Sequence, residues 1–435
     1  MRLALRHISL ASVAAVTTTA LALTSTPATA ATAAPAPHGG SGGGWTAAWG
    51  VAHQYPGTPE GWPPNWSSDG FADESVRQTL RVSSAGSQVR VRLSNRYGTK
   101  PLVITGATVG RTGEGAALRP GTVRTLRFQG GRGLTVPTGK DAVSDALALP
   151  VRPLERLTVT LHFAPGGTGP VSYHADGLTT SYRAVGDRTR DTSGRPFAGG
   201  TSYAYYALSG VEVAGSRTDG TVVTFGDSIT DGAGSTPDAD NRYPDQLAER
   251  LTAARSRLSV VNSGISGNLL LSDSSCFGEK GIARFRHDVL DRPGVRTAVV
   301  LIGINDIGGG GQPDFGCGTA PEVTARSVVD GHKRLIRMAK ERGVRIVGAT
   351  LTPFKGAPYG YDTEAKQKLR KEVNHWIRTS GAYDAVADLD RALRDPADPD
   401  RLLPAYDSGD RIHPSDAGMD VMARTVRPQL VDDDR

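Results

Sequence analysis

The sequence predicts two structural parts, an all-β sandwich followed by a doubly wound, three-layer α/β domain. Two observations support this prediction. Between residues 45 and 215, short runs of alternating polar and apolar residues are separated by turn residues, with no long helical period between them. From about residue 216, continuous apolar runs alternate with amphipathic segments of helical period. The first pattern is typical of sandwiches and the second of parallel α/β sheets.

The alternation is clearest in three runs of the first part. Residues 88–93 alternate strictly, residues 102–105 follow a Gly-Thr-Lys-Pro turn, and residues 157–163 alternate again before Ala-Pro-Gly-Gly. Strands of this length and spacing favour a sandwich of antiparallel sheets. Residues 45–215 are therefore predicted to be a β-sandwich accessory domain.

The second part, residues 216–435, is a regular series of apolar and amphipathic segments. Apolar runs predict strands at residues 221–226, 258–261, 297–302, 345–349 and 385–388. Helical period predicts helices at residues 245–254, 322–342 and 363–379. Continuous apolar strands are expected where helices cover both faces of a parallel sheet.

The N-terminal residues have the features of an export signal. Two arginines precede a small, apolar stretch over residues 8–23, and residues 28–30 (Ala-Thr-Ala) offer a small-x-small cleavage site. We therefore expect residues 1–30 to be a signal peptide and the protein to be secreted and extracellular. Residues 31–44, rich in Ala, Pro, Gly and Ser, are expected to be a flexible linker. No later stretch approaches the length of a membrane span, so no transmembrane segment is expected.

Cys276 and Cys317 are the only two cysteines of the chain. An even pair in an exported protein favours a disulfide, which would constrain the unfolded chain by roughly 4 kcal/mol on the entropy model. A metal pair and a free catalytic thiol are the alternatives. Because no histidine lies nearby at ligand spacing, we expect the disulfide and no metal site.

The charge of the chain gives little indication of a nucleic-acid partner. The formal net charge is +6, and the basic residues are spread over both halves without a long Lys/Arg run. Nucleic-acid binding usually requires a concentrated basic patch, so we expect no such partner. The oligomeric state is left open.

Four candidate functional residues follow predicted strands. Ser228 follows the first strand of the α/β part, Gly267 the second and Asn305 the third, and His413 lies in a loop after the last. Ligand sites of open α/β sheets lie outside the carboxyl ends of the strands. We therefore expect these residues to converge on one edge of the sheet.

The same residues provide what acyl transfer requires. A serine hydroxyl needs a base, and His413 can accept its proton because an imidazole titrates near neutrality. Asp410, three residues before His413, can hydrogen-bond the other ring nitrogen. The backbone N–H groups of Ser228 and Gly267 and the side-chain amide of Asn305 are candidate oxyanion donors, each contributing about 3 to 4 kcal/mol.

Two neighbouring carboxylates have another possible role. Asp227 and Asp306 could be metal ligands. The prediction we favour is that they hold the turns together through capping and side-chain hydrogen bonds.

The four motifs together carry a family resemblance. They occur in the order Gly-Asp-Ser-Ile (226–229), Gly-x-x-Gly-Asn (264–268), Gly-x-Asn-Asp (303–306) and Asp-x-x-His-Pro (410–414). This order resembles the sequence blocks of the SGNH (GDSL-type) hydrolase superfamily, over about residues 221 to 430. The resemblance implies a flavodoxin-like α/β/α sheet and the catalytic and oxyanion roles given above. It also implies esterase, lipase or carbohydrate-deacylase activity without a metal or cofactor. The layout, with a sandwich before the hydrolase domain, resembles that of exported members of this superfamily, some of which are grouped with xylan esterases.

The sequence thus predicts a secreted serine esterase that acts on an acylated carbohydrate, a lipid or a small ester. Short acyl groups such as acetyl are favoured because the aromatic content is only 6%. A lipase or phospholipase for longer chains is the alternative within the same reaction class. A non-catalytic protein that binds cell wall or sugar is the alternative outside it. The first domain could be a sugar-binding module, a lid or a stability partner.

Overall fold

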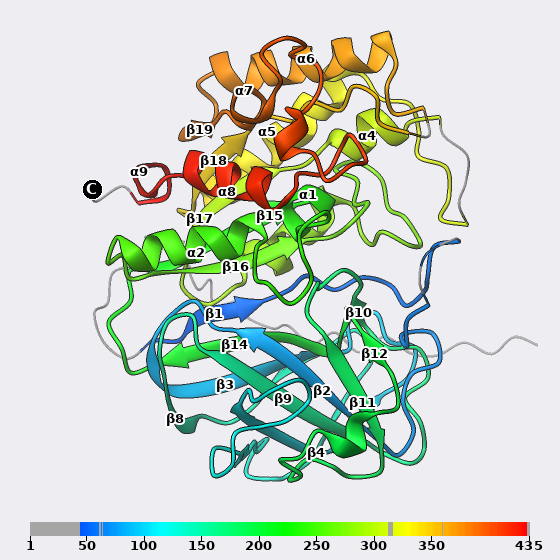
Figure 1. The fold of residues 1–435 in the computed structure, drawn as a ribbon, viewed down its shortest axis with the longest axis vertical. Coiled ribbons are helices and arrows are strands. Elements are labelled where there is room, and N and C mark those ends of the chain that lie inside the picture. The colour runs from blue at the N-terminus through cyan, green and yellow to red at the C-terminus, as the bar shows by residue number, and fades with distance from the viewer. Residues whose placement is uncertain (1–43, 61, 63, 312–315, 359, 433–435) are drawn as a thin grey trace, which may run out of the picture. The chain divides into compact units, whose positions relative to one another are not determined.

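The computed structural model describes residues 44–60, 62, 64–311, 316–358 and 360–432. The predicted signal peptide (1–30) and the predicted linker up to residue 43 lie outside the described residues. Figure 1 shows an antiparallel β part, coloured blue to green, and an α/β part, coloured green to red. The antiparallel β part ends at residue 214, the last residue of its last strand, and the α/β part follows.

The first part is a sandwich of antiparallel sheets. One sheet has the order β1-β14-β3-β7, with β8 also paired to β3. The other has the order β12-β11-β2-β9-β4-β5, with β6 also paired to β4, and β10 pairs with β13 separately. The strands are β1 (Thr46–Gly50), β2 (Glu74–Arg81), β3 (Gly86–Ser94), β4 (Leu102–Arg111), β5 (Arg124–Thr125), β6 (Leu134–Val136), β7 (Asp141–Val143), β8 (Leu147–Val151), β9 (Arg156–Phe163), β10 (Tyr173–His174), β11 (Ser181–Val185), β12 (Thr201–Ser202), β13 (Tyr205–Tyr206) and β14 (Leu208–Ala214).

Period-two alternation explains why these segments form strands around a core. In β3, the side chains of Val89, Val91 and Leu93 are fully buried, whereas the residues between them are charged or polar. The buried set packs with inward residues of the facing sheet in one hydrophobic cluster. The predicted all-β sandwich is therefore confirmed.

The second part contains a parallel sheet with the order β16-β15-β17-β18-β19. In chain order this is 2-1-3-4-5, the flavodoxin-like arrangement, which confirms the predicted fold class. The strands are β15 (Gly220–Gly226), β16 (Leu258–Gly264), β17 (Val295–Leu301), β18 (Arg345–Ala349) and β19 (Ala385–Ala387). Where the order reverses, between β15 and β17, such sheets leave a crevice at the carboxyl ends of the strands.

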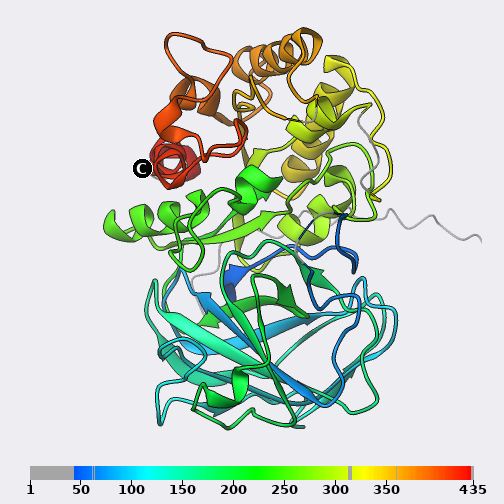
Figure 2. The same ribbon diagram turned by 45° about the vertical axis from the view of Figure 1, so that its right-hand side comes forward.

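Helices cover both faces of this sheet. On one face α2 packs with α8, and on the other α5 packs with α3 and α6 (Figure 2). The helices are α1 (Ser228–Asp231), α2 (Tyr243–Ala253), α3 (Gly281–Phe285), the π-helix η2 (Arg286–Leu290), α4 (Ile304–Gly309), α5 (Ala325–Glu341), α6 (Glu364–Thr379), α7 (Leu389–Leu393), α8 (Asp416–Thr425) and α9 (Pro428–Val431), with 3-10 turns at η1 (Arg195–Phe197) and η3 (Pro404–Tyr406).

The predicted boundaries differ from the observed ones where capping decides them. The helix predicted from residue 322 begins at Ala325, because Thr324 accepts a hydrogen bond from the N–H of Ser327 at 3.1 Å. The hydroxyl oxygen of Ser327 accepts a hydrogen bond from the N–H of Thr324 at 3.0 Å, which completes a capping box.

The sandwich covers the edge strand β16 of the parallel sheet. The N–H of Val260 in β16 donates to the hydroxyl of Ser83, which in turn donates to the carbonyl of Ala48 at 2.7 Å. Ala47, in β1, is part of the hydrophobic cluster of the α/β part. An edge strand with unpaired backbone groups is thereby covered within the same chain.

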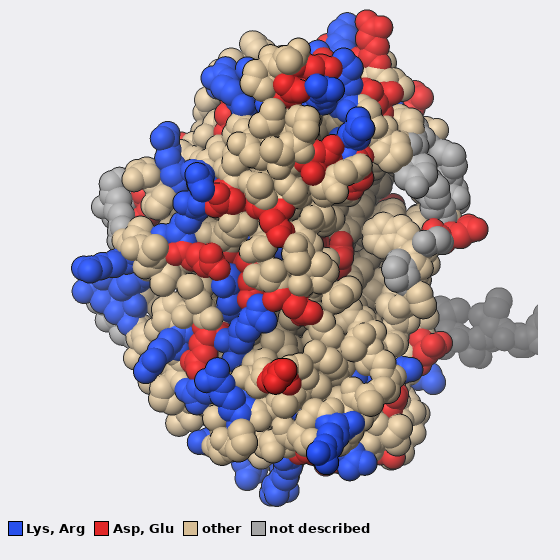
Figure 3. All heavy atoms as spheres, in the orientation of Figure 1, with Lys and Arg blue, Asp and Glu red and all other residues tan. Residues whose placement is uncertain are grey.

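Charged side chains of both signs are mixed on the surface. On the face shown in Figure 3, Lys and Arg side chains are interspersed with Asp and Glu over both parts. Of the helices in the described residues, none is long and apolar enough to cross a lipid bilayer.

Candidate active site

Ser228 is the first residue of α1 and follows the carboxyl end of β15 after a single residue. That intervening residue, Asp227, caps the helix by accepting a hydrogen bond from the N–H of Ile229 at 3.1 Å. Ser228 is buried, with 7% of its surface exposed. At the first position of a helix, its N–H has no intrahelical acceptor and is free for a ligand.

Two hydrogen bonds join the three predicted catalytic side chains. Ser228 Oγ lies 2.8 Å from Nε2 of His413, and Nδ1 of His413 lies 2.6 Å from Oδ2 of Asp410. The other oxygen of Asp410 accepts hydrogen bonds from the N–H of Ile412 at 3.0 Å and of His413 at 2.8 Å. Side-chain and backbone contacts of Asp410 therefore fix both the loop and the ring.

The environment of Asp410 keeps its carboxylate ionised. Burial alone would raise its pKa, but the hydrogen bonds and charge of His413 and the N–H of Ile412 hold the pKa well below its usual range. An ionised carboxylate accepts a hydrogen bond from the Nδ1–H and so fixes the tautomer of the neutral imidazole. Nε2 then carries the lone pair that faces the hydroxyl of Ser228.

The strand register brings the predicted oxyanion residues to the same edge. Gly226 of β15 pairs with Gly264 of β16 and with Leu301 of β17. Gly267 and Asn305 lie shortly beyond these pairs. The amide of Asn305 donates to the carbonyl of Asn268 at 3.0 Å, so the two segments are in direct contact.

The amide of Asn305 has a fixed orientation. Its Oδ1 accepts a hydrogen bond from the hydroxyl of Tyr361 at 2.9 Å, and one N–H donates to Asn268. An amide nitrogen carries two donors, so a second N–H remains for a ligand. Asn305 as a whole is 4% exposed, and its buried amide is a rigid donor.

Gly267 has a backbone conformation and a contact that exclude larger residues. Its φ is +76°, and a Cβ there would lie 2.3 Å from the ring of Phe277. Its N–H has no acceptor among the described residues. Gly264, the other glycine of the motif, ends β16 against the backbone of Asp231. The geometry thus favours Gly267 as the donor.

The carboxylates of Asp227 and Asp306 stabilise turns by accepting backbone hydrogen bonds. Asp306 accepts hydrogen bonds from the N–H groups of Leu270 at 2.7 Å and Leu271 at 2.9 Å, and burial raises its pKa to about 6. Burial also raises the pKa of Asp227 to about 7. Among the described residues, no group of three His, Cys, Asp or Glu is placed to hold a metal ion.

Arg284, in α3, is a central residue of the site that sequence reasoning missed. It is fully buried and donates to the carbonyls of Gly226 at 2.6 Å and Ser263 at 2.8 Å. It also donates to the side chain of Asn268 at 2.9 Å. It thus ties β15 and β16 to the loop that carries Gly267. An arginine in the segment Gly-Ile-Ala-Arg-Phe gives no local sign of this role.

The predicted disulfide between Cys276 and Cys317 is confirmed, with a Cα–Cα distance of 5.0 Å. Cys276 precedes Phe277, whose ring lies against Gly267. The carbonyl of Phe277 accepts a hydrogen bond from the side chain of Asn268 at 2.7 Å. The disulfide therefore anchors a wall beside the candidate oxyanion donor.

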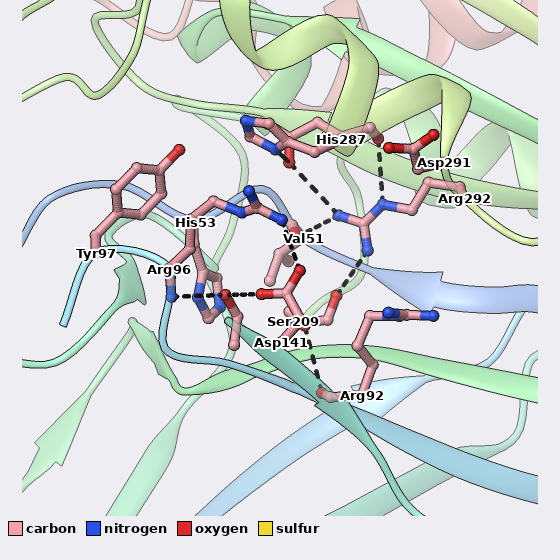
Figure 4. Close-up of a pocket in the computed structure, with 12 residues that line it drawn as sticks. Val51, His53, Arg92, Arg96, Tyr97, Asp141, Ser209, His287, Asp291 and Arg292 are labelled. Atoms are coloured by element: carbon pink, nitrogen blue, oxygen red, sulfur yellow. Dashed lines mark hydrogen bonds and ion pairs between the residues drawn. The ribbon is translucent and has the colours of Figure 1, made fainter. Parts of the chain in front are cut away.

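A cavity of about 240 Å³ lies elsewhere, between the sandwich and the η2 segment (Figure 4). Its described lining contains none of the predicted catalytic residues, and its charges already have partners. Arg96 pairs with Asp141 at 2.7 Å, and Arg292 donates to the carbonyls of Val51 at 2.7 Å and Ser209 at 3.0 Å. The cavity is thus part of the packing between the two parts of the chain.

One family model matches the α/β part of the chain. Residues 224–421 match the model of the GDSL-like Lipase/Acylhydrolase family. These residues form a GDSL-like acylhydrolase domain. All five predicted site residues lie within this range, and the match places the domain in the esterase and lipase class of enzymes.

Solved structures similar to this chain cover about half of it. A GDSL-like lipase from Bacteroides thetaiotaomicron is 17% identical and covers 50% of this chain and 90% of its own, with a TM-score of 0.36. A variant of an acetyl xylan esterase from Geobacillus stearothermophilus is 24% identical and covers 48% and 93%, with a TM-score of 0.36. An α/β hydrolase from the metagenome of Lake Arreo is 23% identical and covers 48% and 94%, with a TM-score of 0.36. A comparison with curated proteins found no match.

Proposed function

We propose that this chain is a secreted serine esterase that hydrolyses carboxylic esters, with Ser228 as nucleophile, His413 as base and Asp410 as its orienting acid. The observation that supports this proposal is the pair of hydrogen bonds from Ser228 to His413 and from His413 to Asp410, at 2.8 and 2.6 Å. A protein that only binds its ligand has no need for a serine joined to an ionised carboxylate through an imidazole.

The reaction proceeds through an acyl-enzyme. Ser228 Oγ attacks the ester carbonyl carbon while its proton passes to Nε2 of His413. The N–H groups of Ser228 and Gly267 and the amide of Asn305 stabilise the resulting oxyanion. When the tetrahedral intermediate collapses, the ester C–O bond breaks and the alcohol leaves with the proton from His413. Water then repeats the sequence on the acyl-serine, releasing the acid and restoring Ser228.

The proposed substrates are esters with short acyl groups, such as acetyl, on polysaccharides or small molecules. The loops that carry the proposed oxyanion donors contain small residues, including Ser266, Gly267 and Asn305. The side chains of His413 and Asp410 are 22% and 42% exposed, so a polymer can reach the site from solvent. The signal-like residues 1–30 and the disulfide support export.

Variants of the proposed catalytic residues test the mechanism. Ser228→Ala and His413→Ala should each reduce kcat/KM for p-nitrophenyl acetate by at least about a thousandfold, because the members of a triad act as a unit. Asp410→Asn should lower it less than either. A fluorophosphonate should label Ser228 in the parent protein and not in Ser228→Ala. Near-normal turnover by His413→Ala at neutral pH would show that another group is the base.

A series of p-nitrophenyl esters tests the acyl length. We expect the highest kcat/KM with acetyl or another short ester. A maximum at about eight carbons or more would favour a lipase or phospholipase. Acetylated xylan, compared with phospholipid and triglyceride emulsions, then tests the alcohol part of the substrate. Absence of fluorophosphonate labelling in a folded protein would indicate the non-catalytic binding alternative.

A further inference from the structure

Two residues of the sandwich reach the acylhydrolase domain beside the proposed oxyanion donor. Nε2 of His174, in β10, lies 3.0 Å from Oδ1 of Asp231. Two residues further along, Oδ2 of Asp176 accepts a hydrogen bond from the hydroxyl of Ser266 at 2.9 Å. The side chains of His174 and Asp231 are each 1% exposed, so the contact is shielded from solvent.

The partners of these two residues belong to the proposed catalytic elements. Asp231 is the last residue of α1, the helix that begins with Ser228. Its Oδ2 accepts a hydrogen bond from the N–H of Ser266 at 2.9 Å. Ser266 directly precedes Gly267, so the peptide that carries the Gly267 N–H begins at Ser266. One carboxylate thus links the nucleophile helix to the oxyanion loop.

Other hydrogen bonds hold both sides of the contact between His174 and Asp231 in place. Nδ1 of His174 lies 2.9 Å from the carbonyl of Ala52, which can only accept, so Nδ1 donates to it. Nε2 of His174 and Oδ1 of Asp231 are buried 3.0 Å apart, and among the described residues each of these atoms faces only the other. Removal of either side chain would leave the buried polar atom of the other facing no polar group, which is costly.

We propose that His174 and Asp176 are positioning residues for the oxyanion hole, and that the sandwich thereby completes the catalytic site. They hold Asp231 and Ser266, and through these the N–H of Gly267, where the oxyanion of the substrate forms. This inference rests on the proposed function, because it assigns the same oxyanion donor. It also gives the sandwich a role in catalysis that a separable sugar-binding module would not have.

The direct test uses residues 31–435 with Asp176→Ala and His174→Gln. Loss of one oxyanion donor lowers kcat by about 10² to 10³, so loosening its support should lower kcat by about 10- to 100-fold. KM for p-nitrophenyl acetate should change by less than about threefold, because the oxyanion exists only in the transition state. Asp176→Asn keeps an acceptor for Ser266 and should restore most of kcat.

A matched control separates positioning from stability. Thr180, in the sandwich, donates its hydroxyl to Asp238 at 2.6 Å, a contact between the two parts that does not involve Ser266. Thr180→Val should lower the melting temperature and leave kcat unchanged. Ser266→Ala removes the same hydrogen bond by deleting its donor, and it introduces no buried charge. The kcat of Ser266→Ala should fall as much as that of Asp176→Ala.

A tetrahedral boronic acid adduct on Ser228 provides a second measurement. Its oxygen occupies the oxyanion hole, so its affinity should weaken in Asp176→Ala and Ser266→Ala by about the same factor as kcat. Unchanged kcat and boronate affinity in folded Asp176→Ala and Ser266→Ala would overturn the positioning role. Equal losses in Thr180→Val would also overturn it. Failure of the proposed function would be seen separately, as ester hydrolysis that survives Ser228→Ala.

Discussion

Asp227, next to the proposed nucleophile, combines full burial with an unsatisfied oxygen. One carboxyl oxygen caps α1 through the N–H of Ile229, and the other has no hydrogen-bond partner among the described residues. Burial raises the pKa of Asp227 to about 7, although the N–H of Ile229 and the charge of His413 oppose the shift. The folded protein therefore keeps a proton that the unfolded chain releases near its ordinary pKa of 3.8.

This shift predicts a pH-dependent cost in stability. Because the native state binds more protons than the unfolded state, its stability falls as pH rises from about 4 to about 7. Asp227→Asn cannot ionise and can still cap Ile229 through its side-chain oxygen. The free energy of unfolding of the variant, minus that of the parent, should rise over this range by up to about 4 kcal/mol and then level off. Urea denaturation at several pH values measures this difference, and parallel pH curves would contradict the prediction.

At the level of elements, the disulfide joins the loop after β16 to the loop after α4. The bond closes a separation of 41 residues and lies next to Phe277, which contacts Gly267. The double variant Cys276→Ser/Cys317→Ser should lose roughly 4 kcal/mol of unfolding free energy, mainly through the freed unfolded chain. Its kcat should also fall because Phe277 is less firmly held.

Reduction of the parent protein provides the control. Mild dithiothreitol treatment should lower esterase activity before circular dichroism detects unfolding, and it should leave the double variant unaffected. Unchanged kinetics and stability after complete reduction, verified by thiol titration, would show that the disulfide has no role at the site.

The sequence predicted the elements whose signal is local. Strand β18 begins and ends where the apolar run 345–349 does, because a strand covered on both faces must be continuously apolar. Helix α8 was not predicted, because Met419 and Met422 are the only large apolar residues among its buried ones. Its start is set by the cap of Ser415, which follows the His413 loop.

The catalytic motifs were predictable because their signal is also local. The residues that position them were not predictable. Ser228 and Asn305 follow apolar strands, so their convergence is implied by the parallel sheet. Arg284, His174 and Asp176 act through partners far away in the chain. Their positions depend on how α3 packs and how the sandwich contacts α1, which no periodicity in the sequence encodes.

At the scale of the whole molecule, the sandwich and the acylhydrolase domain share buried contacts. Ala47 of the sandwich packs in the hydrophobic cluster of the sheet, and Ser83 satisfies the edge of β16. Arg292 donates from the acylhydrolase domain to two carbonyls of the sandwich, those of Val51 and Ser209. Separation of the two parts would leave the N–H of Val260 in β16 and the carbonyl of Val51 without these partners.

We therefore predict that residues 31–435 unfold in one cooperative transition. Scanning calorimetry should show a single peak with equal calorimetric and van't Hoff enthalpies. Arg292→Met, which leaves the buried carbonyl of Val51 without its donor at about 1 to 3 kcal/mol, should lower the midpoint of that peak without splitting it. Ser228→Ala, which touches none of these contacts, should leave the midpoint unchanged. An interface with buried hydrogen bonds and a shared core must couple the unfolding of the two parts. Two resolved transitions in the parent protein would therefore contradict this prediction and show that the parts fold independently.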